Sequence, residues 1–541
     1  MEVVNLSLPA TNRFATEYIA QTPEIQAFFH YRYNEKLEYE RRYDELISRS
    51  FMRQELAAHI EQYMSKYPSS DMIQASLEKL RQENSSVIIG GQQAGILTGP
   101  LYSIHKIISI IQLAKEKEKD LHIPVIPVFW IAGEDHDYPE VNHVFIENDK
   151  KLEKRVYPEK IHDKRMVSDI KLNRDQCLTW VEDVIQSLGE TEYTKDLLSM
   201  MEISIQKSDT FVDFFAHLIM NLFKDTGLLI VDSGDKNLRR LEKEFFAKQI
   251  DSCEEITNAV LRQQMELTKD GYSKTIDMSS LAANLFYYDE ENYERVLLEY
   301  DGKFSGKDGY FQFSKQNLLE LAKEFPEKLS NNVVTRPMMQ EWLFPTLAFI
   351  AGPGEIAYWA ELKQAFEQFG LKMPPIVPRL NITFLDRTVE SDMKELNLSL
   401  EEVLISGSNK KKDEFLHSIR DKQLTELFVK SKQDLLKNYE ELEEHLRVND
   451  KGLVPLLKKN EGLLLKQLEF MEIKLEQAQQ LKYETVISKY TRIENALRPL
   501  ESPQERVLNV LFYLNQYGLN FANNLLDCTY TFDGTHKLIK I

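Results

Sequence analysis

Apolar residues along the chain follow two patterns, and each pattern predicts a different kind of element. Amphipathic stretches near 28–80, at 101–118, at 211–224 and from Glu355 onward have the spacing of helices. Short, continuous apolar runs, which are typical of buried parallel strands, occur at 86–90, 125–132, 227–232, 345–352 and 375–379. Strand, turn, helix and strand in this order make the βαβ unit of a parallel sheet. We therefore predict an α/β chain whose residues 1–385 form a parallel-sheet core.

Two stretches inside this core alternate polar and apolar residues instead. One covers 145–169 and the other covers 285–313, where Glu294–Tyr300 alternates in the manner of a half-buried strand. Half-buried strands are typical of antiparallel sheets. We expect small antiparallel insertions, at about 140–210 and 236–330, that decorate the core.

After residue 385 the pattern of strands and glycines ends. Over 411–500 apolar residues recur in steps of three, four and seven, with a break at Asn449–Gly452. Two such stretches joined at a short break predict an antiparallel coiled-coil hairpin of helices over 386–500. Because two helices alone leave apolar flanks exposed, we expect a homodimer in which a second copy covers them.

The last part of the chain, 501–541, has a pattern of its own. A helical stretch comes first, and strand-like runs follow at 529–532 and 536–541. We expect this tail to pack back on the core.

Composition excludes several classes of protein. The chain is 43% hydrophobic and 28% charged, as globular proteins are. A formal net charge of −19 argues against broad binding to nucleic acid, which needs a cationic surface. The three cysteines show no metal-ligand spacing. Pro124 and Pro127 interrupt the most apolar run, and Met1–Pro9 has no basic region of a signal peptide. We therefore expect a cytoplasmic protein without a membrane span.

Glycine is scarce, with 20 in 541 residues, yet Gly90, Gly91, Gly95 and Gly99 follow the first predicted strand closely. Ligands of open α/β sheets bind at the edge where such turns lie, because glycine exposes backbone N–H groups at the head of the next helix. The candidate substrate-binding residues of this turn are Gly91, Gln92 and Thr98, the last also as the cap of the helix, and Gln93 is a candidate catalytic residue. The alternative is that the glycines only allow close packing. GxGxxG and GK[ST] patterns are absent from the segment, so a dinucleotide or Walker-type site is not predicted.

The second predicted strand is followed by Gly133 and then by four ionisable residues, Glu134, Asp135, His136 and Asp137. Such residues are costly to hold beside a buried strand unless they are used. We predict that His136 is a general acid or base and that a carboxylate holds a substrate ammonium group. A metal site and a solvated loop that caps the next helix are the alternatives.

Further candidates lie in three other segments. His105 and Lys106 belong to the helix after the glycine turn and are expected to face the same cleft. Arg336 is suited to clamp a carboxylate with two hydrogen bonds, although a structural salt bridge is an equal alternative. The remaining candidates for substrate binding are Gly354, Glu355, Tyr358 and Arg379.

Four segments together resemble the cysteine-adding enzymes of bacillithiol biosynthesis, the BshC family. They are GGQQAGILTGP from Gly90, GEDHDYPEVN from Gly133, TRPMMQ from Thr335 and AGPGEIAYWAEL from Ala351, followed by the coiled coil. The resemblance covers essentially the whole chain. It implies a Rossmann-like core with connecting-peptide insertions and a coiled-coil dimer. It also implies a ligase that joins cysteine, through its carboxyl group, to the amine of glucosaminyl-malate.

The same resemblance implies a nucleotide, ATP or ADP, bound away from the central cleft. We predict no metal. The core is similar to class I aminoacyl-tRNA synthetases but lacks their HxGH and KMSKS signatures. We therefore expect the nucleotide elsewhere, between the coiled coil and the tail, near Arg492, Glu505, Arg506 or Lys537. The alternative functions are another nucleotidyl- or acyl-transferase on the same core and a dimeric coiled-coil scaffold without enzymatic activity.

Overall fold

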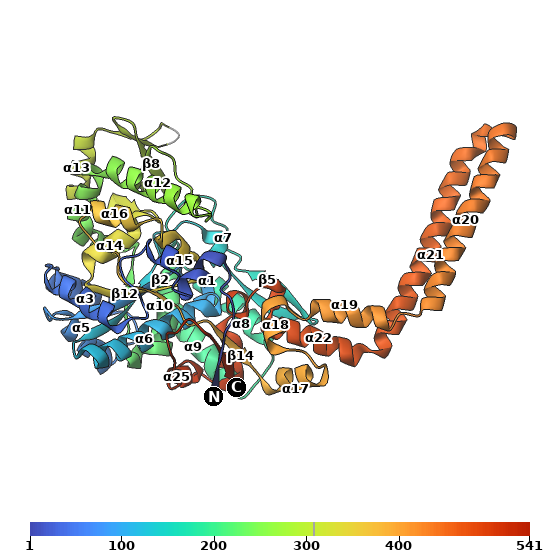
Figure 1. The fold of residues 1–541 in the computed structure, drawn as a ribbon, viewed down its shortest axis with the longest axis horizontal. Helices are drawn as coiled ribbons and strands as arrows, with labels where there is room; N and C mark the ends of the chain where they lie inside the picture. Colours follow the sequence, from blue (N-terminus) through green and yellow to red (C-terminus); the bar gives the residue numbers. More distant parts are fainter. Residues whose placement is uncertain (307–308) are drawn as a thin grey trace. The chain divides into compact units, whose positions relative to one another are not determined.

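The computed structural model describes residues 1–306 and 309–541, so Lys307 and Asp308 of the predicted insertion at 236–330 lie outside it. The described chain divides into two units (Figure 1). The first unit contains Met1–Phe384 together with Gln504–Ile541, and the second contains Leu385–Pro503.

A five-stranded parallel sheet forms the centre of the first unit. Its strands, in spatial order, are β13 (Ile376–Pro378), β12 (Thr346–Ala351), β2 (Ser86–Gln92), β3 (Val125–Ile131) and β6 (Leu229–Asp232). The first of these strands along the chain, β2, lies in the middle of the sheet. The next two, β3 and β6, follow on one side of it, and β12 and β13 lie on the other side. This Rossmann-like order reverses between β2 and β12, and the predicted parallel core is confirmed.

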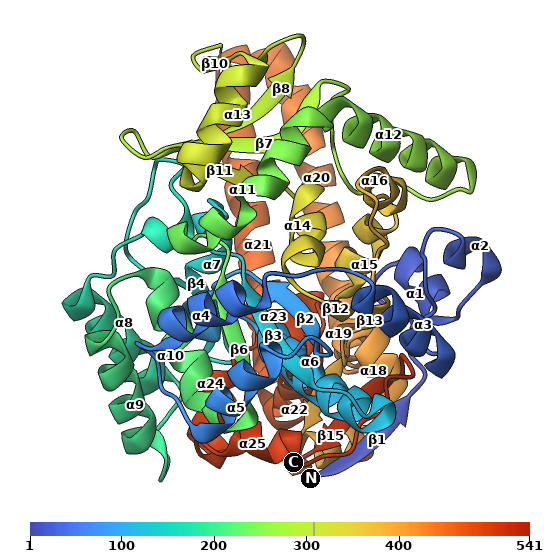
Figure 2. The same cartoon turned by 90° about the vertical axis from the view of Figure 1, so that its left-hand side faces the viewer.

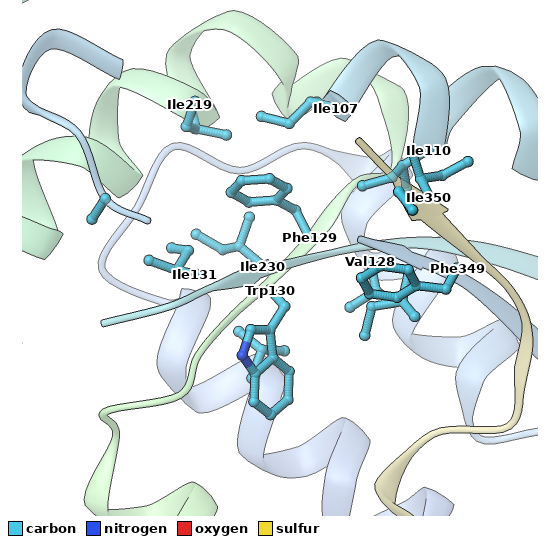
Figure 3. Close-up of a cluster of buried hydrophobic side chains, with 14 of the residues drawn as sticks. Ile107, Ile110, Val128, Phe129, Trp130, Ile131, Ile219, Ile230, Phe349 and Ile350 are labelled. Carbon is cyan, nitrogen blue, oxygen red and sulfur yellow. The ribbon is translucent and has the colours of Figure 1, made fainter. Parts of the chain in front are cut away.

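Helices cover both faces of this sheet because its strands are apolar on both faces. Figure 3 shows Phe129 pointing toward Ile107 of α6 (Leu101–Leu121) and Ile219 of α10 (Phe211–Phe223), while Trp130 points to the opposite face. Both strand residues are almost completely buried. Further helices of the unit are α1 (Arg13–Ile19), α2 (Pro23–Gln26), α3 (Lys36–Ile47), α4 (Arg53–Met64), α5 (Asp71–Leu80), α14 (Thr335–Leu343), α15 (Pro353–Trp359) and α16 (Lys363–Gln368).

Two segments decorate the core. The first contains α7 (Tyr138–Val141), the antiparallel hairpin of β4 (His143–Asn148) and β5 (Lys151–Val156), and the helices α8 (Arg174–Ser187) and α9 (Thr194–Gln206). The second contains α11 (Lys236–Asp251), α12 (Cys253–Lys269), α13 (Lys315–Glu324) and an antiparallel sheet, which lie at the top of Figure 2. The strands of that sheet, in spatial order, are β10 (Gln312–Phe313), β9 (Phe304–Gly306), β8 (Glu294–Tyr300), β7 (Ala282–Asp289) and β11 (Leu329–Asn331).

The C-terminal tail returns to the first unit. Three short helices, α23 (Gln504–Val507), α24 (Val510–Tyr517) and α25 (Phe521–Leu526), precede β15 (His536–Lys540). β15 pairs antiparallel with β1 (Glu2–Leu6), and β14 (Ile382–Leu385) completes that sheet. The strand predicted at 529–532 is wrong, because these residues belong to no sheet. The Tyr530 side chain is buried, and its hydroxyl donates a hydrogen bond to the Leu525 carbonyl.

The second unit is helical. Its helices are α17 (Arg387–Glu395), α18 (Leu400–Ser406), α19 (Asn409–Ser418), α20 (Lys422–Asn449), α21 (Val454–Lys482) and α22 (Glu484–Leu497). α20 and α21 lie side by side as the predicted hairpin (Figure 1), and the ion pair between Lys432 and Glu472 joins them at 2.5 Å. Throughout the described residues, no helix combines the length and the apolar character needed to cross a membrane.

Candidate functional site

A cavity of about 600 Å³ opens at the carboxyl edge of the parallel sheet, between the ends of β2, β3 and β12. This is the edge where strand order reverses, and ligands of open α/β sheets bind at such a point. Predicted site residues that line it are Gly91, Gln92, Gln93, Lys106, Glu134, Asp135, His136, Asp137, Arg336, Gly354, Glu355, Tyr358, Arg379 and Arg506. The structure thus brings residues from distant segments into one cavity.

The glycine turn and the acidic loop lie side by side because β2 and β3 are neighbouring parallel strands, with Gly91 opposite Trp130. Gln93 Nε2 donates a hydrogen bond to Asp135 Oδ2 at 2.7 Å, and the backbone N–H of His136 donates to Asp135 Oδ1 at 2.7 Å. Burial alone would raise the pKa of Asp135, but the Gln93 hydrogen bond and the positive charge of Arg295 lower it overall. Asp135 is therefore held as a carboxylate.

Glycine at the start of the acidic loop has a packing reason. A Cβ atom at Gly133 would lie 2.1 Å from Ser168 Oγ and 2.2 Å from Asp232 Oδ1, so any side chain there would force these two groups to move. Burial raises the pKa of Asp232, at the end of β6, to about 7. Close packing also explains part of the glycine turn, since a Cβ at Gly95 would lie 2.6 Å from Gly99 Cα.

Glu134 is engaged in a buried ion pair. Its Oε2 accepts a hydrogen bond from Arg239 Nη2 at 2.5 Å, and Arg239 Nη1 donates to Glu242 at 2.8 Å. Burial would lower the pKa of Arg239, but the two carboxylates together raise it. Although Glu134 lines the cavity, its charge is neutralised by Arg239, so its role is to hold the acidic loop in place.

His136 has a partner that the sequence did not reveal. Arg295 of β8 donates from Nη1 to His136 Nδ1 at 3.3 Å, and it is itself held by Ser330 Oγ at 3.0 Å and the Asn331 carbonyl at 2.7 Å. Burial and the charge of Arg295 lower the pKa of His136. The only sequence signal at Arg295 is strand alternation, which places the residue on a face and says nothing of its neighbours.

Lys106 fastens the glycine turn to the end of β12. Its Nζ donates to the Gly91 carbonyl at 2.7 Å and to Glu355 Oε2 at 2.5 Å, and Glu355 also accepts from the backbone N–H of Gly352 at 2.7 Å. Burial lowers the pKa of Lys106 although Glu355 opposes the change. Its charge is therefore already neutralised inside the protein.

The arginines of the cavity differ in how many of their guanidinium hydrogen-bond donors are without a partner in the described chain. Arg379 forms two hydrogen bonds of 2.6 Å with Glu505, so its charge is used within the core. Arg336 donates to the Tyr358 hydroxyl at 2.6 Å, while its buried Nε has no partner among the described residues. Arg506 is exposed and has no hydrogen bond or ion pair with the described part of the chain.

Two predicted residues do not line the cavity. Thr98 is not the cap of α6, because its backbone φ of +75° belongs to a turn and Pro100 occupies the cap position. His105 does not face the cleft. It is fully buried, and its Nδ1 lies 3.0 Å from Glu505 Oε2.

The four residues predicted near a nucleotide have different surroundings. Glu505 is buried against Arg379, and Lys537 Nζ is 2.9 Å from Asp533 Oδ1. Arg492 lies in the second unit and pairs with Asp392 at 2.9 Å. Only Arg506 lines the cavity, and the nucleotide site stays a prediction. Across residues 1–306 and 309–541, no group of three or more His, Cys, Asp or Glu side chains is arranged to hold a metal ion.

Comparisons with known proteins agree over the full chain. Residues 1–380 match the model of the bacillithiol biosynthesis BshC N-terminal Rossmann-like domain, and residues 382–541 match that of the BshC C-terminal coiled-coil domain. The chain is 45% identical over 544 residues to a "Putative cysteine ligase BshC" of Geobacillus sp. (strain WCH70), and 42% identical over 542 residues to one of Bacillus cereus. Both alignments cover 100% of each chain.

Among the solved structures that match is a protein of Campylobacter jejuni described as a "putative arginyl t-RNA synthetase". The alignment covers 88% of this chain and 98% of that one, with 12% identity and a TM-score of 0.22. A score at this level supports no inference about the fold.

Proposed function

The chain belongs to the bacillithiol biosynthesis BshC family, and we propose that it is a cysteine ligase that joins cysteine, through its carboxyl group, to the amine of glucosaminyl-malate. One observation carries this proposal. The cavity at the reversal of strand order combines arginines that keep donors free with an acidic loop. A substrate that carries both carboxylates and an amine needs this combination.

Amide formation requires an activated carboxyl group, because a carboxylate oxygen is a poor leaving group. We therefore propose ATP as the co-reactant, which converts the cysteine carboxylate to an acyl phosphate or adenylate. The amine nitrogen then attacks the carbonyl carbon. The bond between this carbon and the oxygen that bridges to phosphorus breaks, and its electron pair leaves on that oxygen with the phosphate or AMP. The proton of the amine needs a base, and Asp137 is suited to accept it. This exposed carboxylate lines the cavity and has no ion pair within the described residues.

The malate carboxylates need cations that are not already neutralised. Lys106 and Arg379 are paired with Glu355 and Glu505, which leaves them poorly suited to this role. Arg336 and Arg506 have donors to spare, and both line the same cavity. Charge-assisted hydrogen bonds from guanidinium groups to carboxylates are the strong ones. We assign the malate group to Arg336 and Arg506.

A homodimer built on the hairpin is part of the proposal. Many large apolar side chains of α20 and α21 are exposed, and a soluble monomer rarely exposes so extended an apolar surface. They are Leu427, Val429, Leu436, Leu442 and Val448 on α20, and Leu456, Leu463, Leu464, Phe470, Met471, Ile473 and Leu481 on α21. A second copy of the same hairpin would bury them.

The test is direct. Purified protein is incubated with cysteine, glucosaminyl-malate and ATP, and the products are followed by mass spectrometry. The proposal expects a thiol product whose mass equals the sum of the two substrates minus water, together with consumption of ATP. Absence of that product, with ATP intact, would contradict it, and product formed from another acyl donor would favour the alternative of a different acyltransferase.

A further inference from the structure

The ring of His136 meets Arg295 through a single nitrogen. Arg295 Nη1 lies 3.3 Å from His136 Nδ1, with the N–H aimed at the ring nitrogen. A guanidinium group carries donors only and does not lose its proton in proteins. His136 Nδ1 must therefore be the acceptor, which requires an unprotonated nitrogen at that position.

Arg295 cannot easily turn away from this contact. It is 6% exposed, its Nε donates to Ser330 Oγ, its Nη2 donates to the Asn331 carbonyl, and its guanidinium carbon lies 3.8 Å from the centre of the Phe286 ring. Three separate contacts thus fix one direction for Nη1. Arg295 comes from the second insertion, so this segment of the chain completes the site built on the parallel sheet.

The other ring nitrogen of His136, Nε2, is the one available to a substrate. A neutral imidazole with an unprotonated Nδ1 carries its hydrogen on Nε2. No described residue is hydrogen-bonded to His136 Nε2, and His136 lines the cavity. In this form the side chain donates a hydrogen bond and has no free lone pair to remove a proton from a substrate.

We propose that Arg295 is a positioning residue that holds His136 as a neutral Nε2–H donor, and that this donor stabilises the oxygen on which negative charge develops when the amine attacks the activated cysteine carbonyl. The assignment rests on the proposed function for its substrate. It replaces the role of general acid or base that the sequence suggested for His136. The base is then a carboxylate, and Asp137 is the adjacent one. A single preorganised donor of this kind contributes about 10²- to 10³-fold to turnover.

The charged groups that face His136 act in both directions. Burial disfavours the imidazolium most, and the charges of Arg295 and Lys164 add to this effect, whereas Asp137 and Asp135 favour the imidazolium. Together these influences lower the pKa of His136. The neutral ring is thus expected to persist at pH values where an ordinary histidine begins to take up a second proton.

The first test needs no turnover. The full chain is labelled with ¹⁵N-histidine, and magic-angle-spinning NMR identifies the His136 ring by the signal that is lost in His136→Gln. At pH 6 we expect an unprotonated Nδ1 and a protonated Nε2 in the unmodified protein. In Arg295→Leu, His136 should take up its second proton at a higher pH than in the unmodified protein, whereas in Arg295→Lys it should not. An imidazolium at pH 6, or a proton on Nδ1, would overturn the proposal.

The second test uses the ligation reaction. Gln at position 136 can donate a hydrogen bond but cannot act as a base, so His136→Gln should turn over at least tenfold faster than His136→Ala. His162→Gln, on an exposed loop, is the matched control and should equal the unmodified protein. Equal rates for the two position-136 variants would overturn the donor role. If the unmodified protein makes no product at all, the proposed function fails while the NMR result still decides the state of the ring.

Discussion

Gln93 Nε2 donates a hydrogen bond of 2.7 Å to Asp135 Oδ2 and thereby joins the loops that follow β2 and β3. The two residues are 42 positions apart in the chain. They meet because parallel neighbours end at the same edge of the sheet. The same amide also reaches Glu140 Oε2 at 3.0 Å, so Gln93 holds two carboxylates that would otherwise repel each other.

Replacement of Gln93 by alanine should slow ligation and change its pH dependence. The Gln93 hydrogen bond lowers the pKa of Asp135, so its loss raises that pKa. The Asp135 carboxylate, which accepts the backbone N–H of His136 and so holds the loop, is then lost at a higher pH, and activity falls with it. A hydrogen bond to a charged group contributes about 1.5–3 kcal/mol, which predicts a loss of about tenfold or more in kcat/KM. The measurement is kcat/KM between pH 5 and 9, with Gln186→Ala on the exposed face of α8 as the control. An unchanged pH profile of kcat/KM would argue against this role of Gln93.

Arg336 and Arg506 should govern the affinity for glucosaminyl-malate. Each variant, Arg336→Ala or Arg506→Ala, removes a charge-assisted hydrogen bond, so KM for this substrate should rise about tenfold to hundredfold while KM for cysteine changes little. Arg240→Ala, which removes an exposed arginine outside the cavity, is the control. Initial rates at varied concentrations of each substrate separate the two constants. Equal effects on both KM values would speak against a malate site at these arginines.

Asp232 should make stability depend on pH in a known direction. Burial raises the pKa of Asp232 to about 7 in the folded protein, whereas an unfolded aspartate has a pKa of about 3.9. The stability that its neutral form contributes is therefore complete below about pH 4 and is lost as pH rises to about 7. Relative to the unmodified protein, Asp232→Asn should gain up to about 4 kcal/mol in unfolding free energy between pH 4 and pH 8.

Chemical denaturation at several pH values measures this difference. Asp225→Asn, on the exposed surface, controls for the loss of one carboxylate. A difference between Asp232→Asn and the unmodified protein that stays constant with pH, or that changes in the opposite direction, would show that Asp232 is ionised in the folded state.

The hairpin should determine the oligomeric state. Leu463 and Phe470 are each more than half exposed and lie two turns apart on α21, so they share a face. The double substitution Leu463→Glu with Phe470→Glu should convert a dimer to a monomer, because buried carboxylates without partners are costly. Light scattering coupled to size-exclusion chromatography reports the mass. Lys243→Glu, at an exposed position of α11 in the first unit, is the charge control. A monomeric unmodified protein would contradict the proposed dimer.

The parts of the fold that the sequence predicted are those with a local signal. The runs at Val125–Ile131 and Thr346–Ala351 are apolar on both faces, as is typical of buried parallel strands, and both are inner strands of the sheet. The ionisable residues 134–137 follow the first of these strands directly, so the sequence also predicted their place at the edge of the sheet.

Contacts between distant segments could not be predicted in this way. His105 is 400 positions from Glu505, and His136 is 159 positions from Arg295. Nothing in the sequence near either histidine indicates its partner. Thr98 failed for a different reason, because the close approach of Gly95 and Gly99 imposes a turn in which Thr98 has a positive φ. A threonine close to a helix start, here two residues before Pro100, favours a cap, and tertiary packing overrides that local preference.

The central claim is that ligation takes place in the cavity between β2, β3 and β12. A crystal structure of the protein with glucosaminyl-malate bound tests it most directly. The account predicts the malate carboxylates within hydrogen-bond distance of Arg336 and Arg506, and the amine facing the loop that carries His136 and Asp137. Density for the substrate at any place outside this cavity, with the cavity empty, would contradict it.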